Sequence, residues 1–326
     1  MPPMVPIWYR GPPYARRSVR RMRFSISIPQ IVADGAFDAD GMRAYLARAE
    51  ELGFDGAWTV EGVVNTMPQL APLETLTFAA SCTQRLRLGC AVFVSSLHSP
   101  LHLAKSVSSL DQISRGRVEV GLGTGGPRQF PAFGLSAEGY VTRFTEVTEV
   151  MKAVWTQERA TYDGRFFQLD GVPMEPKPFQ KPRPPVWYGG HHPNALRRAV
   201  RHADGFFGAG SATTAAFAEE VRTVREEMKA QDRPDFRIAK RIYIAVDDDP
   251  ERARTRMAEA LVRYYRFQNP NADKLIAVAV TGTPDDCVRG VQEVADAGAE
   301  MILLNPLFDD AEQMERLAAE VMPRVA

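Results

Sequence analysis

The sequence predicts an α/β protein folded as a (β/α)8 barrel, or TIM barrel, with insertion segments at the C-terminal face of the barrel. From residue 23 onward, short apolar runs alternate with amphipathic runs, as expected for strands followed by helices. The alternation contains eight strand-like runs, and a chain of 326 residues is long enough to form one such barrel. An open, doubly wound parallel sheet is the alternative fold.

The first unit of the alternation lies in residues 23–60. Apolar and polar residues alternate in residues 23–30, which is typical of a strand. In residues 42–52 the apolar positions recur at helical spacing, and Gly53 is expected to end that helix. The strand-like run FDGAWTV follows directly. These three elements therefore form a β-α-β unit.

The remaining elements repeat this unit along the chain. The other predicted strands are 85–94, 117–123, 186–190, 204–210, 236–246 and 300–306. The other predicted helices are 72–83, 101–114, 137–155, 193–202, 214–231, 250–267 and 284–297, followed by a helix after the eighth strand. Helices between successive strands indicate a parallel sheet that is covered by helices.

Two segments fall outside the repeating pattern. Residues 1–22 are rich in proline and arginine and have neither helical nor strand periodicity, so we expect a flexible N-terminal tail. Residues 23–326 then form the barrel. Residues 158–184 are too long for an ordinary connection and rich in proline and glycine. We expect them to form an irregular excursion over the mouth or rim of the barrel.

Composition and charge exclude several classes of function. The 40 basic and 40 acidic residues cancel, so the overall charge favours neither nucleic acid nor an anionic membrane. No apolar run approaches the roughly 20 residues of a membrane span. Cys82, Cys90 and Cys287 have no paired spacing and indicate neither a disulfide framework nor a zinc site. We expect a cytoplasmic enzyme that acts on a small molecule without a metal ion.

In a barrel of this kind the chemistry lies where strands end in βα loops. Glu61 follows the second predicted strand, and His98 lies on the loop after the third. Imidazole titrates near neutral pH, so His98 is the first candidate for proton transfer, although a lone histidine often only packs or caps a helix. Glu61 is a candidate general acid or base, a cofactor ligand, or an ordinary solvated carboxylate.

Two glycine-rich turns are candidates for binding an anion. The sequence GLGTGG in residues 121–126 ends the fourth strand, and Gly189 and Gly190 lie between the fifth strand and a helix. Free backbone N–H groups at such turns bind phosphate, although the spacing fits neither the dinucleotide fingerprint nor the P-loop and a plain tight turn is the alternative. Two such turns on one rim indicate a phosphorylated cofactor.

Several of these motifs occur in an order typical of a known family. The segments RLRLGCAVFVSSLHSPLHLAKSVSSLDQISRGRVEVGLGTGG, PAFG, KPRPPVWYGG and ADGFF make the chain similar to the bacterial luciferase-like monooxygenase superfamily over nearly all of residues 23–326. The sequence most resembles the branch that uses the deazaflavin coenzyme F-420. This resemblance implies a barrel, hydride transfer between coenzyme F-420 and a small organic substrate, and a homodimer.

The resemblance also implies roles for individual residues. The implied cofactor-binding positions are Glu61, Ala91, Val92, Thr124, Gly125, Tyr188, Gly189 and Gly190. The residues of the two glycine-rich turns match positions that hold the cofactor phosphate. Ala91 and Val92 match a strand bulge with a non-proline cis peptide behind the deazaflavin ring. Tyr188 and its neighbour Trp187 flank the cofactor in this interpretation, or else belong to the barrel core.

One position departs from the family pattern. Many deazaflavin relatives have a histidine directly after the acid that follows the second strand, whereas this chain has Gly62 after Glu61. Either another group, with His98 as first candidate, transfers the proton, or the reaction needs no such group, or the barrel binds without catalysing. A flavin mononucleotide (FMN) dependent monooxygenase and a non-catalytic flavin-binding barrel therefore remain as alternatives.

Overall fold

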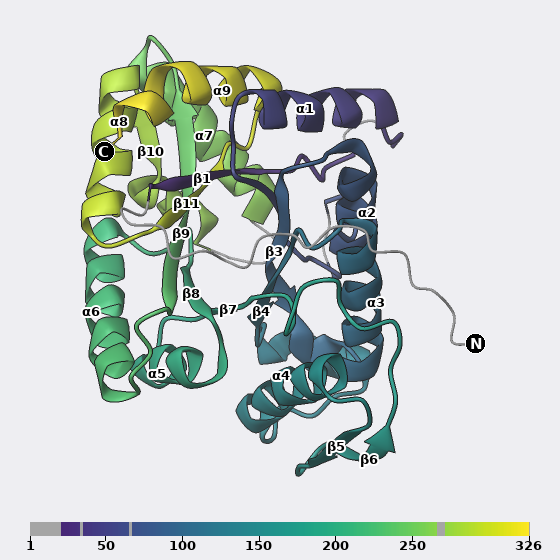
Figure 1. Ribbon diagram of the computed structural model, residues 1–326. Helices are drawn as coiled ribbons and strands as arrows, with labels where there is room; N and C mark the ends of the chain where they lie inside the picture. Colours follow the sequence, from purple (N-terminus) through teal and green to yellow (C-terminus); the bar gives the residue numbers. More distant parts are fainter. Residues whose placement is uncertain (1–20, 33–34, 65–66, 266–270, 326) are drawn as a thin grey trace.

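The computed structural model describes residues 21–32, 35–64, 67–265 and 271–325. Eight parallel strands in this part of the chain form a closed barrel (Figure 1). They are β1 (Arg23–Ser27), β2 (Gly56–Thr59), β3 (Arg87–Val94), β4 (Val118–Gly123), β7 (Val186–Gly189), β8 (Gly205–Gly208), β9 (Arg237–Val246) and β11 (Met301–Asn305). The strand order is β9-β11-β1-β2-β3-β4-β7-β8, and β8 pairs with β9. This last pairing closes the ring and excludes the open sheet.

Helices cover the outside of the barrel (Figure 1). They are α1 (Ala39–Glu51), α2 (Pro72–Cys82), α3 (Pro100–Ile113), α4 (Tyr140–Thr156), α5 (Pro193–His202), α6 (Thr214–Ala230), α8 (Pro284–Asp296) and α9 (Asp310–Arg316). Proline at the first helical position begins α2, α3, α5 and α8, where its missing N–H costs no hydrogen bond. Gly53 follows the C-cap of α1 with φ +88°, which glycine adopts without steric cost. The expected helix ends are therefore largely confirmed.

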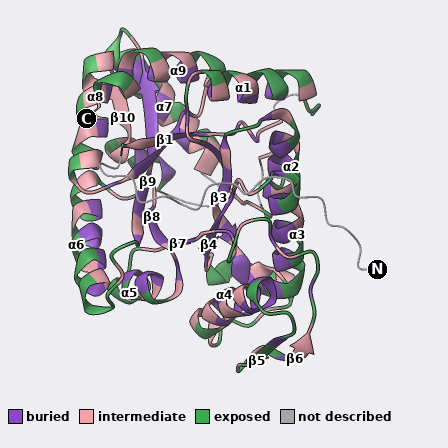
Figure 2. Cartoon of the chain, viewed as in Figure 1, coloured by how far each residue is buried: buried purple, intermediate pink, exposed green. Residues whose placement is uncertain are grey.

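The buried hydrophobic side chains of the described residues form three clusters: a large one between the strands and the helices, an inner layer inside the barrel, and one between β9 and α7. In Figure 2 the strands are mostly buried, whereas the helices carry both buried and exposed residues. The inner layer contains Trp58, Trp187, Phe207, Ala239, Met301 and Leu303. The ring of Trp58 packs edge-on against Phe207 at 5.0 Å and Trp187 at 6.5 Å between centroids. These residues fill the barrel, so that a ligand has space only above them at the carboxyl ends of the strands.

Glu119 on β4 is a fully buried carboxylate at the opposite, amino-terminal end of the barrel. Its Oε1 atom accepts hydrogen bonds from Arg23 at 2.8 Å and Arg87 at 2.6 Å, and its Oε2 atom accepts one from Trp187 Nε1 at 2.8 Å. Burial alone would raise the pKa of Glu119, but the two arginines outweigh it and hold the pKa at about 2. The Glu119 carboxylate and its three partners form a cluster that connects β1, β3, β4 and β7.

The predicted excursion at residues 158–184 differs from expectation in structure and position. It contains an antiparallel hairpin of β5 (Ala160–Asp163) and β6 (Gln168–Val172). The Glu146 carboxylate on α4 accepts hydrogen bonds from the backbone N–H groups at the hairpin tip, and residues 175–177 accept hydrogen bonds from side chains of α3. The segment therefore packs along the outside of α3 and α4 and does not cross the barrel mouth. The reason is that α4 runs antiparallel to the strands and ends at the amino-terminal side.

The insertion at the C-terminal face is a different segment, which follows β9. It comprises α7 (Pro250–Tyr265), a short 3-10 segment (Ala272–Val278) and β10 (Val280–Gly282), which pairs in parallel with the end of β9. Residues 266–267 of the expected helix lie outside the described residues. Helix α8 then packs against the barrel, so α7 is additional to the one helix per strand of a simple barrel. It lies beside the carboxyl ends of β1 and β11.

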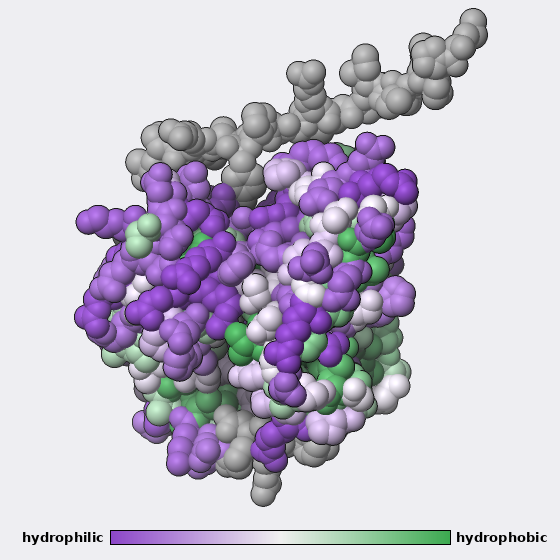
Figure 3. Space-filling model, turned by 90° about the horizontal axis from the view of Figure 1, so that it is seen from below, coloured by the Kyte–Doolittle hydropathy of each residue, from purple (hydrophilic) through white to green (hydrophobic). Residues whose placement is uncertain are grey.

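The face seen in Figure 3 is mostly hydrophilic, with hydrophobic side chains in separate small groups. Exposed large hydrophobic residues, such as Ile113 and Val63, are scattered over the described surface. None of the described helices is both long and apolar enough to span a bilayer. The expected tail at residues 1–22 lies almost entirely outside the described residues, which begin at residue 21.

Candidate functional site

Glu61 and His98, the two candidates for proton transfer, are in direct contact. Glu61 Oε1 lies 2.8 Å from His98 Nε2, and the Glu61 side chain is only 4% exposed, compared with 25% for His98. Glu61 Oε2 also accepts a hydrogen bond from the backbone N–H of Val94 at 2.5 Å. A carboxylate that is anchored on one side orients the imidazole on the other. The two candidate residues therefore form one carboxylate–imidazole pair at the carboxyl end of the barrel.

Two local structures bring this pair together. Gln30 anchors the loop after β2, because its side chain accepts a hydrogen bond from Val60 N and donates to Val60 O. On the other side, β3 ends in a short 3-10 turn (Ser95–Leu97), where the N–H of His98 donates to Ser95 O. Glu61 thus extends from a fixed loop to the end of the neighbouring strand.

Strand β3 is irregular beside this pair. Its register with β4 shifts between Cys90 and Phe93, and the peptide between Ala91 and Val92 is cis, as predicted. Gly121 and Gly123 of β4 face this irregularity. A Cβ atom at Gly121 would lie 2.1 Å from Cys90 O, and one at Gly123 would lie 2.5 Å from Val92 Cγ2. These two glycines are therefore required for packing against β3.

Other residues of the two glycine-rich turns have backbone N–H groups without a hydrogen-bond partner in the described structure. Within the described residues, the backbone N–H groups of Thr124, Gly125 and Gly190 make no hydrogen bond to protein. The turns follow adjacent paired strands, since Leu122 lies opposite Tyr188 in the β4–β7 ladder. Unpaired N–H groups on two neighbouring turns are the donor set that binds a phosphate. Both turns lie at the same end of the barrel as Glu61.

The side chain of Tyr188 points away from the mouth, which corrects the expectation that it flanks a cofactor. It is 1% exposed, its hydroxyl is hydrogen-bonded to Thr148 on α4 at 2.6 Å, and its ring packs on Phe144. Trp187 points inward but donates to Glu119 near the other end of the barrel. Both aromatic residues belong to the core.

The other histidines have structural partners or lie on the surface. His191 pairs with Glu220 at 2.8 Å, His202 pairs with Glu149 at 3.1 Å, and His192 caps the N-terminus of α5. In the described part of the chain, no group of three or more His, Cys, Asp or Glu side chains is arranged to hold a metal ion.

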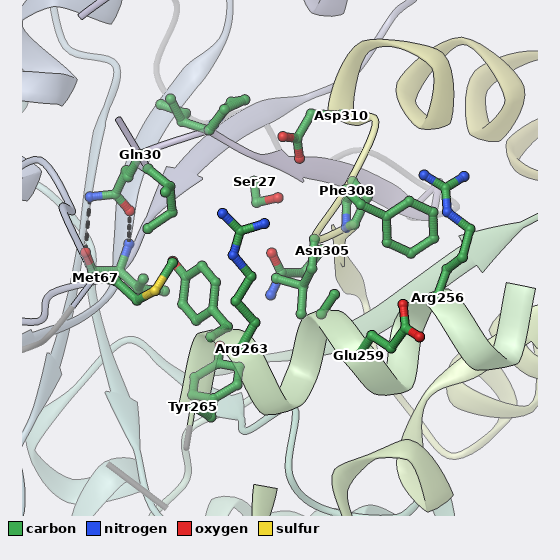
Figure 4. Close-up of a pocket in the computed structure, with 18 of the residues that line it drawn as sticks. Ser27, Gln30, Met67, Arg256, Glu259, Arg263, Tyr265, Asn305, Phe308 and Asp310 are labelled. Atoms are coloured by element: carbon green, nitrogen blue, oxygen red, sulfur yellow. Dashed lines mark hydrogen bonds between the residues drawn. The ribbon is translucent and has the colours of Figure 1, made fainter. Parts of the chain in front are cut away.

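A cavity of about 440 Å³ lies at the carboxyl ends of β1, β2 and β11, beside α7 (Figure 4). In the ring of strands this side is opposite to β4 and β7, which carry the glycine-rich turns. The cavity has an apolar wall that includes Trp58, Val60 and Phe308. Its polar groups include Asn305 and Asp310, and Figure 4 shows Arg263 extending from α7 toward Ser27. A few polar groups in an otherwise apolar concave site are typical of small-molecule binding.

Asp310 and Glu259 are the two acids that line this cavity, and Asp310 has no side-chain partner within the described residues. Burial raises its pKa to about 6, and the neighbouring Asp309 adds to the rise. Its carboxyl group therefore takes up and releases a proton within the range in which most enzymes work. Asp310 was not among the site residues predicted from the sequence, although its position at the start of the helix after the eighth strand follows the βα-loop rule.

We expect Asp310→Asn to stabilise the protein at pH 7.5 by about 1–2 kcal/mol and to have little effect at pH 4. Because the folded pKa is raised above the ordinary value, the folded state binds the proton more tightly. Stability is therefore lost as pH rises from about 4 to 6, and asparagine does not suffer this loss. Urea unfolding of both proteins from pH 4 to 8 measures the difference. A constant difference over this range would contradict the assignment.

Comparison with protein families gives one match over most of the chain. Residues 22–301 match the family described as luciferase-like monooxygenase. An uncharacterised protein of Mycobacterium tuberculosis is 39% identical over 143 residues, which cover 43% of this chain and 50% of that protein. The chain spans half or less of the length of this relative and of two from Sinorhizobium fredii.

Two longer matches have named activities. The 5,10-methylenetetrahydromethanopterin reductase of Archaeoglobus fulgidus is 25% identical, and the alignment covers 86% of this chain and 94% of the reductase. The F420-dependent glucose-6-phosphate dehydrogenase of Intrasporangium calvum is 24% identical, with 86% and 92% covered.

Solved structures share the fold. The monooxygenase RslO1 from Streptomyces bottropensis has a TM-score of 0.82 at 24% identity and covers 94% of this chain and 100% of its own. A type II Baeyer-Villiger monooxygenase, the oxygenating constituent of 3,6-diketocamphane monooxygenase from a Pseudomonas putida plasmid, in complex with FMN, has a TM-score of 0.76 at 16% identity. It covers 94% of this chain and 99% of its own. At these identities the likeness concerns the barrel alone.

Proposed function

The chain belongs to the luciferase-like monooxygenase family, and on this basis we propose that it transfers a hydride between coenzyme F-420 and a small organic substrate. The observation that carries the proposal is the contact between Glu61 and His98 at the carboxyl end of the barrel. It supplies a histidine at the site although Gly62 stands where many deazaflavin relatives have one. The relative from Intrasporangium calvum, named as F420-dependent, supports the choice of cofactor.

The residues at the mouth fit a phosphorylated cofactor. The free N–H groups of Thr124, Gly125 and Gly190 would hold its phosphate. A Cβ atom at Gly126 would meet nothing within 4 Å, so the outer side of the turn is open. In the family pattern the ring lies over Ala91 and Val92, between the turns and Glu61. The cavity beside β1 and β11 would then hold the substrate on the far side of the ring.

Coenzyme F-420 supplies the hydride chemistry when it is bound. The protein orients the cofactor and the substrate, limits the access of water to them and provides a group for proton transfer. The anchored Glu61 holds the Nε2 side of the His98 imidazole. His98 then gives or takes the proton that accompanies the reaction at the substrate. The apolar wall formed by Trp58 and Phe308 limits the access of water to the reacting groups.

We expect Gly189→Asp to weaken the binding of coenzyme F-420 by about 100-fold or more, because a carboxylate would face the phosphate. Gly189→Ala is the matched control. Its Cβ atom would lie 3.4 Å from Val92 Cγ1 and 3.9 Å from Phe207 O, both ordinary contacts, so the variant should fold and bind within about tenfold of the parent. Gly125 is less suitable, because its φ is +64° and a Cβ atom would lie 2.3 Å from Val94 Cγ1.

Calorimetric titration of both variants and the parent measures this effect. Equal affinity for all three proteins, with unfolding midpoints unchanged, would show that the phosphate does not bind at this turn. The proposal for the cofactor site would then fail.

The two alternatives make different predictions for the same protein. An FMN-dependent monooxygenase would bind FMN more tightly and consume oxygen, and the open N–H groups of the turns suit the phosphate of FMN equally well. A non-catalytic flavin-binding barrel would bind a cofactor without turnover across a broad substrate panel. The homodimer and the cytoplasmic location also stay predictions, and light scattering of the purified protein tests the first of them.

A further inference from the structure

Arg241 on β9 is a cation inside the barrel mouth that has no counter-charge among the described residues. Along β9, Ala239 belongs to the inner layer, and Arg241 lies two residues further on the same face, toward the carboxyl end of the strand. Its Nε atom is buried and has no hydrogen-bond partner. No carboxylate of the described residues forms an ion pair with it. Among the described residues, its one hydrogen bond runs from Nη2 to the hydroxyl of Tyr243 at 3.1 Å.

Tyrosines surround this guanidinium. The Arg241 guanidinium lies 5.4 Å from the ring centre of Tyr243, and Tyr264 and Tyr265 from α7 are close enough to interact with its charge. Burial raises the pKa of Tyr264 to about 12 and raises that of Tyr265 as well, so these hydroxyls are neutral at physiological pH. Neither Tyr264 nor Tyr265 therefore balances the charge of Arg241.

Gly210 packs directly against the Arg241 side chain. A Cβ atom at Gly210 would lie 3.1 Å from Arg241 Nε and 3.1 Å from the Tyr243 ring. Glycine at this position thus leaves room for the guanidinium in its present orientation. Arg241 as a whole is only partly buried, so a ligand entering the mouth can reach it.

Arg241 also lies near the candidate proton-transfer pair. Burial raises the pKa of the Cys90 thiol, the charge of Glu61 adds to the rise, and the charge of Arg241 opposes it. Both charges therefore act on the residue that precedes the Ala91–Val92 peptide. A partly buried cation without a partner is destabilising for the free protein and is retained where a ligand supplies the anion.

We propose that Arg241 binds an anionic oxygen group of a ligand in the barrel mouth, through the guanidinium N–H groups for which the described residues provide no acceptor. This chemistry has two sources. One is a carboxylate on the substrate, and the other is the amide–carbonyl edge of the reduced cofactor ring when it carries negative charge. The second source rests on the proposed function, whereas the first does not.

The test compares the parent with Arg241→Met, which keeps most of the volume and removes the charge, and with Arg241→Lys, which keeps the charge. Without ligand, we expect Arg241→Met to unfold at the same temperature as the parent or a higher one. A clear fall in the unfolding temperature would overturn the proposal, because it would show that Arg241 stabilises the fold itself.

Two binding measurements separate the sources. In the first, benzoate at millimolar concentration should raise the unfolding temperature of the parent and of Arg241→Lys but not of Arg241→Met, if the anion belongs to the substrate. In the second, Arg241→Met should weaken the binding of reduced coenzyme F-420 about 10- to 100-fold more than that of the oxidised form, if the anion belongs to the ring.

Either result supports the proposal and identifies the source. If Arg241→Met changes neither the response to benzoate nor the ratio of the two cofactor affinities, the proposal is wrong. The unfolding and benzoate measurements need no cofactor. A failure of coenzyme F-420 to bind would therefore contradict the proposed function without deciding the role of Arg241.

Discussion

Replacing Glu119 with glutamine is expected to lower the free energy of unfolding by about 3–5 kcal/mol at pH 7. Within the described part of the chain, this carboxylate is the only ion-pair partner of Arg87, and it also binds Arg23 and Trp187. Glutamine retains one oxygen but introduces an NH₂ group among donors, which leaves buried charges without compensation. Urea unfolding of both proteins measures the loss.

The exposed ion pair between Glu138 and Arg165 provides the matched control. In this pair Glu138 Oε1 lies 2.7 Å from Arg165 Nη2. Glu138→Gln should change stability by less than about 1 kcal/mol, because water screens that pair. The pH dependence gives a second check. Since the folded pKa of Glu119 is lowered to about 2, its contribution is present above the ordinary carboxyl pKa and is lost as pH falls from about 4 to 2. Similar losses for both variants at pH 7 would contradict this account of the cluster.

Replacing Glu61 with glutamine is expected to lower kcat by about 100- to 1000-fold on any substrate that turns over, with cofactor affinity within about tenfold of the parent. Glutamine can still accept the hydrogen bond from Val94 N, so the loop keeps its position. It presents no negative charge to His98, so the imidazole is no longer held in its present orientation. Steady-state rates and cofactor titration together separate a loss of rate from a loss of binding.

His98→Ala should give a loss of similar size, and the double variant should be no slower than the slower single variant, because the two residues act as a unit. His102→Ala is the control, since His102 is exposed on α3 four residues further along the chain. Unchanged rates for both Glu61→Gln and His98→Ala would leave proton transfer to the substrate or water. Additive losses in the double variant would show that the residues act separately.

The barrel was predictable because its signals are local. Strands and helices follow from apolar periodicity over about ten residues, and proline and glycine mark the helix ends. The contact between Glu61 and His98 was not predicted as such, but both candidates were found by the rule that βα loops carry the chemistry. The rule succeeds because parallel strands bring the loops after β2 and β3 side by side.

Features that depend on distant contacts were not predictable in the same way. Gly121 and Gly123 look like part of a phosphate turn in the sequence, whereas their small size accommodates β3, about 30 residues earlier in the chain. The strands β5 and β6 are short and are bordered by proline and glycine. The alternation of apolar and polar residues along them is therefore too brief to predict a hairpin. The cavity is assembled from β1 and from α7 and β11, which both follow β1 by more than 200 residues.

Strand alternation could have corrected one expectation. Trp187 points into the barrel, so its neighbour Tyr188 must point outward toward α4. The resemblance to the family placed both residues beside the cofactor, and the two-residue period of a strand argues against it. Residue roles carried over from a family therefore need this check before they are assigned.

The most direct test of the proposed function is a separate titration of the purified protein with coenzyme F-420 and with FMN, followed by calorimetry. We expect coenzyme F-420 to bind at least about tenfold more tightly, a difference of about 1.4 kcal/mol. The phosphate groups of both ligands suit the same turns, so the preference must come from the ring beside Glu61 and from the tail that only coenzyme F-420 carries beyond its phosphate. Tighter binding of FMN, together with turnover that depends on oxygen, would contradict the account and favour a monooxygenase.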